Sequence, residues 1–267
     1  MSEINESSPS ILAREDGATI AYRATAGKTP GVMFLTGYKS DMGGGKALFL
    51  EDLCRRRGTA FTRFDYQGHG LSSGAFTDGT IGLWTADAVA VLDAVTEGPQ
   101  VLVGSSMGGW IMLLAALERP QRVAGLIGIA AAADFTEDLM PGRLTAEQKA
   151  ALERDGVIYA PNPYGPEPTP IAKKFIDEGR DHLVLRQRLP LACPTRLIHG
   201  MRDADVPWQT SLRLCQMLNA EDVELFLDKD GEHRLSEPHD LDRLGFIVES
   251  LLTRIESPPP DMPADPS

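Results

Sequence analysis

Short apolar runs alternate with helical patterns along most of the chain. The runs are nearly continuous in apolar residues, as is typical of strands covered on both faces, and they span 31–35, 59–65, 100–104, 123–131, 195–200 and 223–228. Between them, apolar residues recur at helical spacing in 45–58, 80–97, 108–120, 207–220 and 240–255. This alternation predicts an α/β fold, with a mostly parallel twisted sheet flanked by helices.

Two features depart from this alternation. Near the start, two strand-like runs meet at Asp16-Gly17, which predicts an antiparallel hairpin. Further along, residues 135–190 lie between two predicted strands and are too long for a simple connection. They contain helical patterns at 145–156 and 171–179. A proline-dense stretch between these, 161–170, predicts an extended path without a helix.

These patterns predict one core with one insertion. Residues 11–134 and 191–256 form the core, and residues 135–190 form a cap over the ends of the strands. The termini, 1–10 and 257–267, are polar or rich in Pro and Asp, which predicts that they are flexible. In the helix predicted at 80–97, we expect Asp87 and Asp93 to face water.

The composition is that of an ordinary globular protein, with 42% hydrophobic and 24% charged residues. The formal net charge of −12 argues against nucleic-acid binding and against a basic face that docks on a membrane. Cys54, Cys193 and Cys215 are widely spaced and odd in number, so they suit a reducing compartment and form no disulfide or metal pattern.

The first residues, MSEINESSPS, have no basic region, no apolar region and no Arg-rich amphipathic character. No stretch of the chain approaches the roughly 20 apolar residues that a membrane span needs. These features predict a cytoplasmic protein without a membrane span, and they leave its oligomeric state open.

Residues 104–108, Gly-Ser-Ser-Met-Gly, match the pattern G-x-S-x-G between a predicted strand and a predicted helix. In that context the pattern is typical of a serine nucleophile held on a sharp strand-to-helix turn, here Ser106. Glycines on both sides allow strained backbone geometry and close packing of the strand and the helix. A turn shifted by one residue would present Ser105 instead, but the glycine spacing favours Ser106.

A serine hydroxyl needs a base, and the base needs a carboxylate that orients it. Of the five histidines, His233 is the candidate base because its loop directly follows the last predicted strand. The others are interpreted as structural or peripheral: His69, His182, His199 and His239. Asp203 and Asp205 both follow a strand and are candidate carboxylates, in the chain order Ser, Asp, His.

An oxyanion hole needs two backbone N–H donors. Met107, which follows the candidate nucleophile, should supply one, and Tyr38, which follows the tight turn at Gly37, should supply the other. The Tyr38 side chain is also a candidate for the wall of the pocket. Gly37, Tyr38 and Trp110 are predicted to contact substrate. No His/Cys cluster is apparent, so we expect neither a metal nor a cofactor.

With these residues the chain resembles the α/β-hydrolase superfamily. HGMRDADVP, 199–207, fits the superfamily pattern H-G-x-x-D-x-x-V-P, which implies that Asp203 is the acid. DYQGHGLSSG, 65–74, is similar to a turn that has an architectural role in the superfamily. One departure is Thr36-Gly37, where His-Gly is common. The resemblance implies the α/β-hydrolase fold.

Over 31–252, stretches such as TGYKSDMGGGKA and EGPQVLVGSSMGGWIML resemble a narrower family, the mitochondrial palmitoyl-protein thioesterases that also hydrolyse an acyl-glucuronide. This resemblance implies a serine hydrolase of acyl esters or thioesters, including S-acylated proteins. A short-chain carboxylesterase, a proline-releasing peptidase and a non-catalytic binding protein on the same fold are the alternatives. The candidates for an acyl channel in the cap are Phe135, Leu139, Val157, Ile158, Tyr159, Tyr164 and Phe175.

Overall fold

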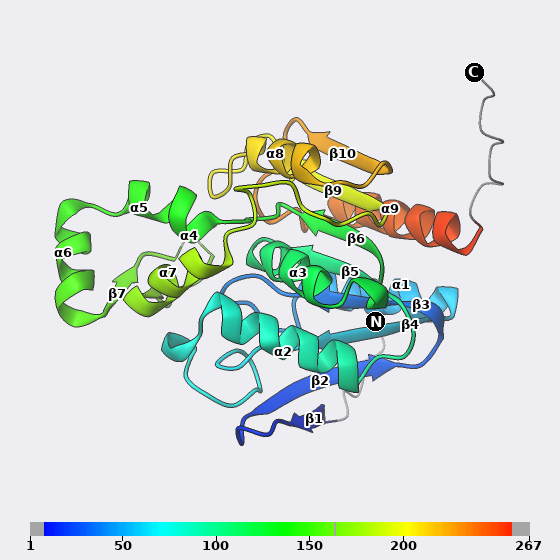
Figure 1. The fold of residues 1–267 in the computed structure, drawn as a ribbon, viewed down its shortest axis with the longest axis horizontal. Coiled ribbons are helices and arrows are strands. Elements are labelled where there is room, and N and C mark those ends of the chain that lie inside the picture. Colours follow the sequence, from blue (N-terminus) through cyan, green and yellow to red (C-terminus); the bar gives the residue numbers. More distant parts are fainter. Residues whose placement is uncertain (1–7, 163, 258–267) are drawn as a thin grey trace.

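The computed structural model describes residues 8–162 and 164–257 and contains an eight-stranded sheet (Figure 1). The strand order is β1-β2-β4-β3-β5-β6-β9-β10. β2 runs antiparallel to both of its neighbours, and the other pairs are parallel. The strands are β1 Ser10–Ala13, β2 Thr19–Thr25, β3 Lys28–Leu35, β4 Thr59–Phe64, β5 Gln100–Ser105, β6 Val123–Ile129, β9 Thr195–Gly200 and β10 Val223–Asp228. The predicted hairpin and the mostly parallel sheet are confirmed.

Helices cover both faces of this sheet. One apolar cluster packs α2 Ile81–Ala94, α3 Met107–Glu118 and α8 Gln209–Met217 against one face, and a second packs α1 Gly45–Arg57 and α9 Pro238–Glu256 against the other. Alternate residues of a strand point to opposite faces. In β5, Leu102 therefore joins the first cluster, and Val101 and Val103 join the second. Coverage on both faces explains the nearly continuous apolar runs.

Local sequence signals set several helix ends. Thr80 caps α2 by accepting the N–H of Leu83 at 3.1 Å. α1 ends at Gly58, whose φ of 75° lies in the left-handed region that glycine adopts without strain. Short 3₁₀ turns, η1 Phe76–Asp78 and η2 Pro120–Arg122, connect further elements.

The expectation that Asp87 faces water was wrong. Asp87 is fully buried, and its carboxylate accepts the backbone N–H of Gln67 at 2.8 Å, the Gln67 side-chain amide at 2.9 Å and the Arg14 guanidinium at 3.2 Å. Burial raises the pKa of Asp87, while the hydrogen bonds from Gln67 oppose that rise. Helical spacing does not reveal that a distant loop covers the polar side of a helix. Asp93 is exposed, as predicted.

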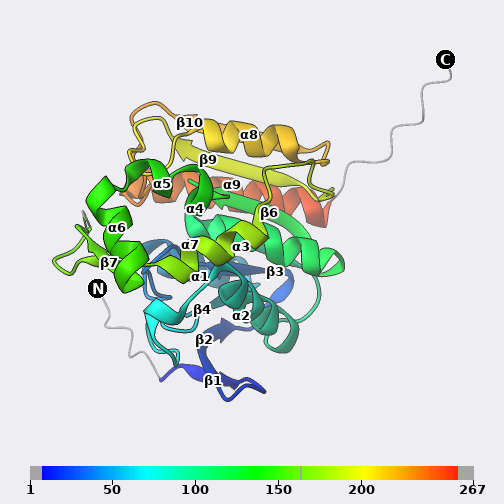
Figure 2. The same ribbon diagram turned by 60° about the vertical axis from the view of Figure 1, so that its left-hand side comes forward.

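The chain between β6 and β9 forms a separate group of short elements, which we call the inserted segment (residues 135–190). It contains α4 Phe135–Asp138, α5 Met140–Arg143, α6 Ala146–Asp155, β7 Val157–Ala160, β8 Thr169–Ala172, α7 Lys173–Gly179 and η3 Arg180–His182. β7 and β8 pair as a two-stranded antiparallel sheet that the sequence did not predict. Figures 1 and 2 show α4 to α7 grouped together at one end of the main sheet.

The predicted flexible termini lie mostly outside the described residues. Ser10, which was predicted to belong to the flexible N-terminal segment, is instead the first residue of β1 and pairs opposite Tyr22. Within 8–162 and 164–257, no helix combines the length and the apolar character needed to cross a bilayer.

Candidate active site

Ser106 occupies a sharp turn between β5 and α3. Its backbone adopts φ 54° and ψ −119°, a strained conformation for a residue with a side chain. Neighbouring backbone overdetermines this geometry, because the N–H of Ser106 donates to Ile129 O at 2.9 Å and its carbonyl accepts from Gly109 and Ala132 at 2.9 and 3.0 Å. Ser105 is the last residue of β5, so the strain falls on Ser106.

The flanking glycines are sterically required. A Cβ on Gly104 would lie 2.4 Å from the carbonyl oxygen of Gly108, and a Cβ on Gly108 would lie 2.2 Å from that of Leu35. Both distances are far below van der Waals contact, so any side chain would force α3 away from β3 and β5. The G-x-S-x-G spacing thus reflects close packing at the turn.

The structure brings Ser106, His233 and Asp203 together in a hydrogen-bonded chain. His233 Nε2 lies 3.0 Å from Ser106 Oγ, and His233 Nδ1 lies 2.7 Å from Asp203 Oδ2. A carboxylate only accepts, so Nδ1 carries the ring hydrogen and Nε2 is free to accept the hydroxyl hydrogen of Ser106. Each residue follows the carboxyl end of a strand, as the sequence predicted.

The Asp203 side chain is buried, and both of its oxygens accept hydrogen bonds. Its Oδ1 accepts the N–H groups of Asp205 and Val206 at 2.8 and 2.7 Å, and its Oδ2 accepts from His233 and from His199 at 3.1 Å. Burial alone would raise the pKa of Asp203. Hydrogen bonds from His199 and His233 and the charge of His233 outweigh burial and hold that pKa well below its usual range. The carboxylate therefore stays ionised.

His199 has a partner that sequence reasoning missed. It is completely buried at the end of β9, with Nδ1 2.7 Å from Ser211 Oγ and Nε2 near both Asp203 Oδ2 and Val206 O, the latter at 3.0 Å. Two acceptors face Nε2, so this nitrogen carries the hydrogen and Nδ1 accepts from Ser211. The available signal was its place in HGMRD, four residues before Asp203.

The loop after β3 passes close to Ser106. A Cβ on Gly37 would lie 3.4 Å from the Cβ of Ser106, so the Gly37-Tyr38 backbone adjoins the serine. The Tyr38 hydroxyl donates to Pro170 O at 2.7 Å, and its ring stacks on Phe175 with centroids 5.0 Å apart. Tyr38 therefore joins this loop to the inserted segment. Met107 begins α3 immediately after Ser106.

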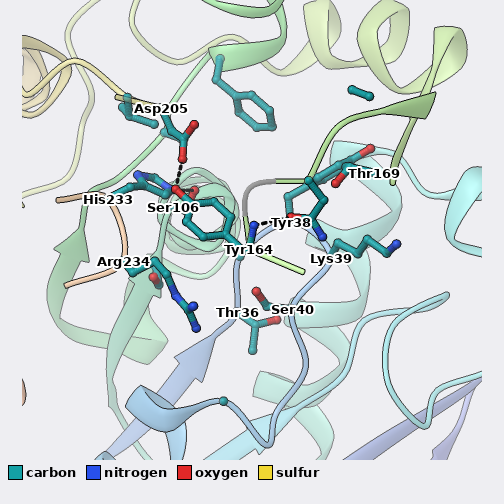
Figure 3. A pocket seen from close by; sticks show the side chains of 18 of the residues that line it. Thr36, Tyr38, Lys39, Ser40, Ser106, Tyr164, Thr169, Asp205, His233 and Arg234 are labelled. Atoms are coloured by element: carbon teal, nitrogen blue, oxygen red, sulfur yellow. Dashed lines mark hydrogen bonds between the residues drawn. The ribbon is translucent and has the colours of Figure 1, made fainter. Parts of the chain in front are cut away.

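A cavity of about 680 Å³ opens above Ser106 and His233 (Figure 3). Gly37 and Tyr38 line it, and their contact with substrate stays a prediction. The inserted segment contributes an apolar wall, formed by Phe135, Leu139, Met140, Leu144 and Ile171. Of the candidates for an acyl channel, Phe135, Leu139 and Tyr164 line the cavity. The others lie elsewhere: Val157, Ile158, Tyr159 and Phe175.

The structure corrects the prediction that Trp110 contacts substrate. Trp110 is completely buried, its indole N–H donates to His182 O at 3.0 Å, and it is absent from the cavity lining. It tethers α3 to η3. Trp110 was predicted to be a pocket residue because it lies on the helix that follows Ser106. Four positions after Ser106, however, its side chain points into the interface between α3 and the inserted segment.

The histidines assigned to other roles lie away from Ser106 Oγ. His69 is buried among aromatic rings, within 4.9 Å of the Phe76 and Trp84 centroids, and burial lowers its pKa to about 4. His182 pairs with Glu178 at 2.8 Å. His239 is exposed in the first turn of α9.

At the mouth of the cavity, Tyr164 lies over the candidate triad. Its hydroxyl donates to the Asp205 carboxylate, and the Arg234 guanidinium lies 5.5 Å from the centroid of its ring. Arg143 approaches the same Asp205 carboxylate at 3.9 Å. Asp205, the other candidate acid, therefore lies at the rim of the cavity with Tyr164 (Figure 3). Asp203, not Asp205, contacts His233.

Two groups of carboxylates and histidines lie close enough together to share an ion, among the residues that the structure describes. One is Asp203, Asp205 and His233, whose ligand atoms already hydrogen-bond within the site. The other is Asp228, His239 and Asp240, where the Arg243 guanidinium bonds to Asp228 and supplies the positive charge.

The chain is similar to proteins of known family. It is 42% identical over 253 residues to mouse palmitoyl-protein thioesterase ABHD10, mitochondrial, covering 94% of this chain and 85% of the relative. The solved mouse structure superimposes with a TM-score of 0.85 over 93% of this chain and all of that one. A putative hydrolase from Agrobacterium vitis, 40% identical, gives 0.86 over 91% and 96%. The family model "Serine aminopeptidase, S33" matches residues 30–156.

These findings overturn the prediction of a cytoplasmic protein. The mouse, cattle, orangutan and human relatives, 39–42% identical, are all named as mitochondrial. The prediction rested on composition and on the first ten residues. Compartments are assigned by targeting signals that receptors read, so the folded domain's composition does not encode them.

The sequence identity to these relatives extends over most of the chain, and their solved structures have the same arrangement of a sheet between two layers of helices. The predicted α/β-hydrolase fold is confirmed, and the protein is a hydrolase of carboxylic esters or thioesters. The chain belongs to the palmitoyl-protein thioesterase ABHD10 family of α/β hydrolases.

Proposed function

We propose that this protein hydrolyses acyl thioesters and related activated esters through Ser106, His233 and Asp203. The observation that carries the proposal is the continuous hydrogen-bonded chain from Ser106 Oγ to Asp203 Oδ2, which opens onto a cavity with an apolar wall. Strain at the turn is consistent with this role, because functional sites are where such backbone geometry concentrates.

In the first half of the reaction, Ser106 Oγ attacks the carbonyl carbon of the substrate while its proton moves to His233 Nε2. Asp203 holds the Nδ1–H of His233 and stabilises the imidazolium that forms. The backbone N–H groups of Met107 and Tyr38 receive the negative oxygen of the tetrahedral intermediate. His233 then gives its proton to the departing sulfur or oxygen, which leaves an acyl group on Ser106.

In the second half, a water molecule replaces the leaving group. His233 Nε2 removes one of its protons, and the resulting hydroxide attacks the acyl carbon. A second tetrahedral intermediate forms at the same N–H donors. When it collapses, His233 returns the proton to Ser106 Oγ, and the carboxylic acid is released.

The substrate class rests on the relatives and on the cavity. The mammalian relatives are named palmitoyl-protein thioesterases, and a volume of about 680 Å³ is within the range of small-molecule sites. The apolar side chains of the inserted segment suit an acyl chain, and this segment is proposed to act as the cap. S-acylated proteins and acyl-glucuronides are the proposed substrates.

A proline-releasing peptidase is the second candidate, because the matching family model is described as a serine aminopeptidase. A peptidase of this kind has to bind a free amino group, for which a carboxylate at the cavity is the expected partner. Asp41 and Asp205 line the cavity, but Tyr164 and Arg143 already engage Asp205, and Asp41 accepts the backbone N–H of Gly43 at 2.8 Å. The apolar wall favours the acyl thioesterase.

The decisive experiment compares purified protein with Ser106→Ala and with Ser105→Ala, its neighbour at the end of β5. We expect hydrolysis of palmitoyl and butanoyl thioesters to fall by about 10⁴-fold or more in Ser106→Ala. Fluorophosphonate labelling should disappear in Ser106→Ala and persist in Ser105→Ala. An acyl-glucuronide and a proline arylamide serve as further substrates.

Each contrary outcome has a definite meaning. Thioester hydrolysis that survives in Ser106→Ala refutes the assignment of the nucleophile. Turnover of the proline arylamide without thioester turnover favours the peptidase. Absence of both turnover and labelling in the wild-type protein, with correct folding by circular dichroism, favours a non-catalytic binding protein.

A further inference from the structure

The charges that line the cavity oppose the charge of the chain. The whole sequence has 38 acidic against 26 Lys and Arg residues. The cavity is instead lined by more bases than acids, with Lys39, Lys46, Arg143 and Arg234 against Asp41 and Asp205. A protein with a negative net charge repels anions over most of its surface. A cavity lined mainly by basic side chains instead attracts them.

Two of these four bases are already neutralised. Lys39 lies 3.7 Å from Glu167, and Arg143 lies 3.9 Å from Asp205. Lys46 Nζ instead donates to the carbonyl of Arg234 and to Ser236 Oγ, both uncharged. Within 8–162 and 164–257, neither Lys46 nor Arg234 has a carboxylate at ion-pair distance.

Lys46 and Arg234 are held close to each other and to the candidate catalytic histidine. Arg234 directly follows His233, and Figure 3 shows both on the same side of the pocket. The hydrogen bond from Lys46 to the Arg234 carbonyl joins the start of α1 to this loop. Burial, and to a lesser extent the charge of Arg234, lower the pKa of Lys46 to about 8, while the charge of Asp240 opposes this.

A residue of the cavity lining carries a buried hydroxyl without a partner. Thr36 is only 2% exposed and lines the cavity, yet its Oγ1 has no hydrogen-bond partner among the described residues. A buried hydroxyl without a partner costs free energy unless a ligand or a water molecule satisfies it. Gly44 and Gly45 also line the cavity at the start of α1, which has no acidic residue in its first turn.

We propose that Lys46, Arg234 and the Thr36 hydroxyl form a subsite for an anionic group on the leaving-group side of the substrate. The inference rests on the proposed function. The apolar wall comes from the inserted segment, whereas these three residues come from the core, so the acyl chain and the anion have separate walls. The position of Arg234 beside His233 assigns the anion to the group that His233 protonates.

The ligand chemistry is a carboxylate or a phosphate attached to the departing thiol or alcohol. Arg234 supplies a planar guanidinium for paired hydrogen bonds, Lys46 supplies a compact charge, and Thr36 supplies one hydroxyl. Both anions suit these donors. An acyl-glucuronide and a phosphopantetheine thioester are chemical examples of each class.

Matched substrates test the subsite. The butanoyl thioester of 3-mercaptopropionate carries a carboxylate, and that of 3-mercaptopropionamide is its neutral counterpart. The butanoyl thioesters of phosphopantetheine and pantetheine form the second pair. The measured quantity is the ratio of kcat/KM for the anionic substrate to that for the neutral one.

We expect this ratio to exceed one for at least one pair in the wild-type protein. It should fall by about tenfold in Arg234→Gln and recover in part in Arg234→Lys, because a charge-assisted contact is lost and then partly restored. Thr36→Val, which removes only the hydroxyl, should lower it severalfold. Lys229→Gln removes an exposed positive charge outside the cavity and should leave the ratio unchanged.

The outcomes separate the subsite from the proposed function. Ser106→Ala abolishes turnover of both members of a pair if the proposed function is correct. A ratio that Arg234→Gln leaves unchanged, in an enzyme that Ser106→Ala still inactivates, refutes the subsite alone. If Arg234→Gln does not fold, the salt dependence of the wild-type kcat/KM ratio tests the subsite. Salt screens charges, so the ratio has to decrease as the salt concentration rises, and a ratio that does not change refutes the subsite.

Discussion

His233 Nε2 lies 3.0 Å from Ser106 Oγ, although the two residues are 127 positions apart in the chain. Each side chain extends from a segment that directly follows a strand, Ser106 after β5 and His233 after β10. Neither strand neighbours the other, since β6 and β9 lie between them. The contact therefore depends on the register of the whole parallel sheet.

The first prediction concerns His199, a positioning residue for Asp203. Replacing it by Met removes the donor to Asp203 Oδ2 and should lower kcat by about tenfold, the effect of losing one charge-assisted hydrogen bond. KM should change little, because His199 does not line the cavity. Steady-state kinetics with a butanoyl thioester measures both.

Two variants distinguish positioning from general damage. His199→Gln can place an amide N–H near Asp203 and should recover part of kcat. Ser211→Ala removes the bond to the opposite ring nitrogen and should have a smaller effect. If all three variants lose activity in proportion to their melting temperatures, His199 has only a structural role.

The second prediction concerns the glycines of the turn. Gly108→Ala should lower the free energy of unfolding by about 3 kcal/mol or prevent folding, because its Cβ overlaps backbone that cannot move aside. Gly142→Ala is the matched control. Its Cβ meets open space in α5, and it should raise stability by up to about 1 kcal/mol. Urea denaturation followed by circular dichroism measures both, and equal effects would contradict the steric argument.

The third prediction concerns the apolar wall. Met140→Trp should narrow the acyl side of the cavity and lower kcat/KM for a palmitoyl thioester about tenfold more than for a butanoyl one. Leu212→Trp places the same side chain at an exposed position on α8, outside the cavity, and should not change the preference. A chain-length series provides the measurement. Loss of the butanoyl reaction to the same extent would indicate that the acyl chain lies elsewhere.

The fourth prediction follows from the lowered pKa of Lys46, about 8. Below that pH Lys46 is charged and the preference for an anionic leaving group is complete. As pH rises through about 8 the charge is lost, so the kcat/KM ratio of the matched thioesters should fall. The charged groups that act on Lys46 are Arg234 and Asp240, and Asp41 also lines the cavity.

Lys46→Arg is the control for this pH dependence. Arginine keeps its charge throughout this range, so the ratio should stay flat between about pH 7 and 9. Ionic strength has to be constant across the series. A ratio that rises with pH in the wild-type protein would have the wrong sign for a lysine contribution.

Sequence reasoning was most successful where neighbouring residues decide the outcome. Ser106 could be placed because the strand, the glycines and the helix that shape its turn are contiguous. It was least successful where distant segments meet. Burial of Asp87 depends on a loop twenty residues away, and the interior position of Trp110 depends on a carbonyl seventy-two residues away. The pairing of β7 with β8 likewise depends on how the proline-dense connection turns.

By itself, the sequence determined the order of strands and helices in the core, the glycine-flanked turn and the three candidate triad residues, because periodicity and steric need are local properties. Only the tertiary structure decided that His199 shares Asp203 with His233, that Asp205 holds the rim, and which side chains reach the cavity. Those contacts depend on the register of the sheet and on packing between segments that are remote in the chain. A local sequence pattern carries no information about the distance between atoms of such segments.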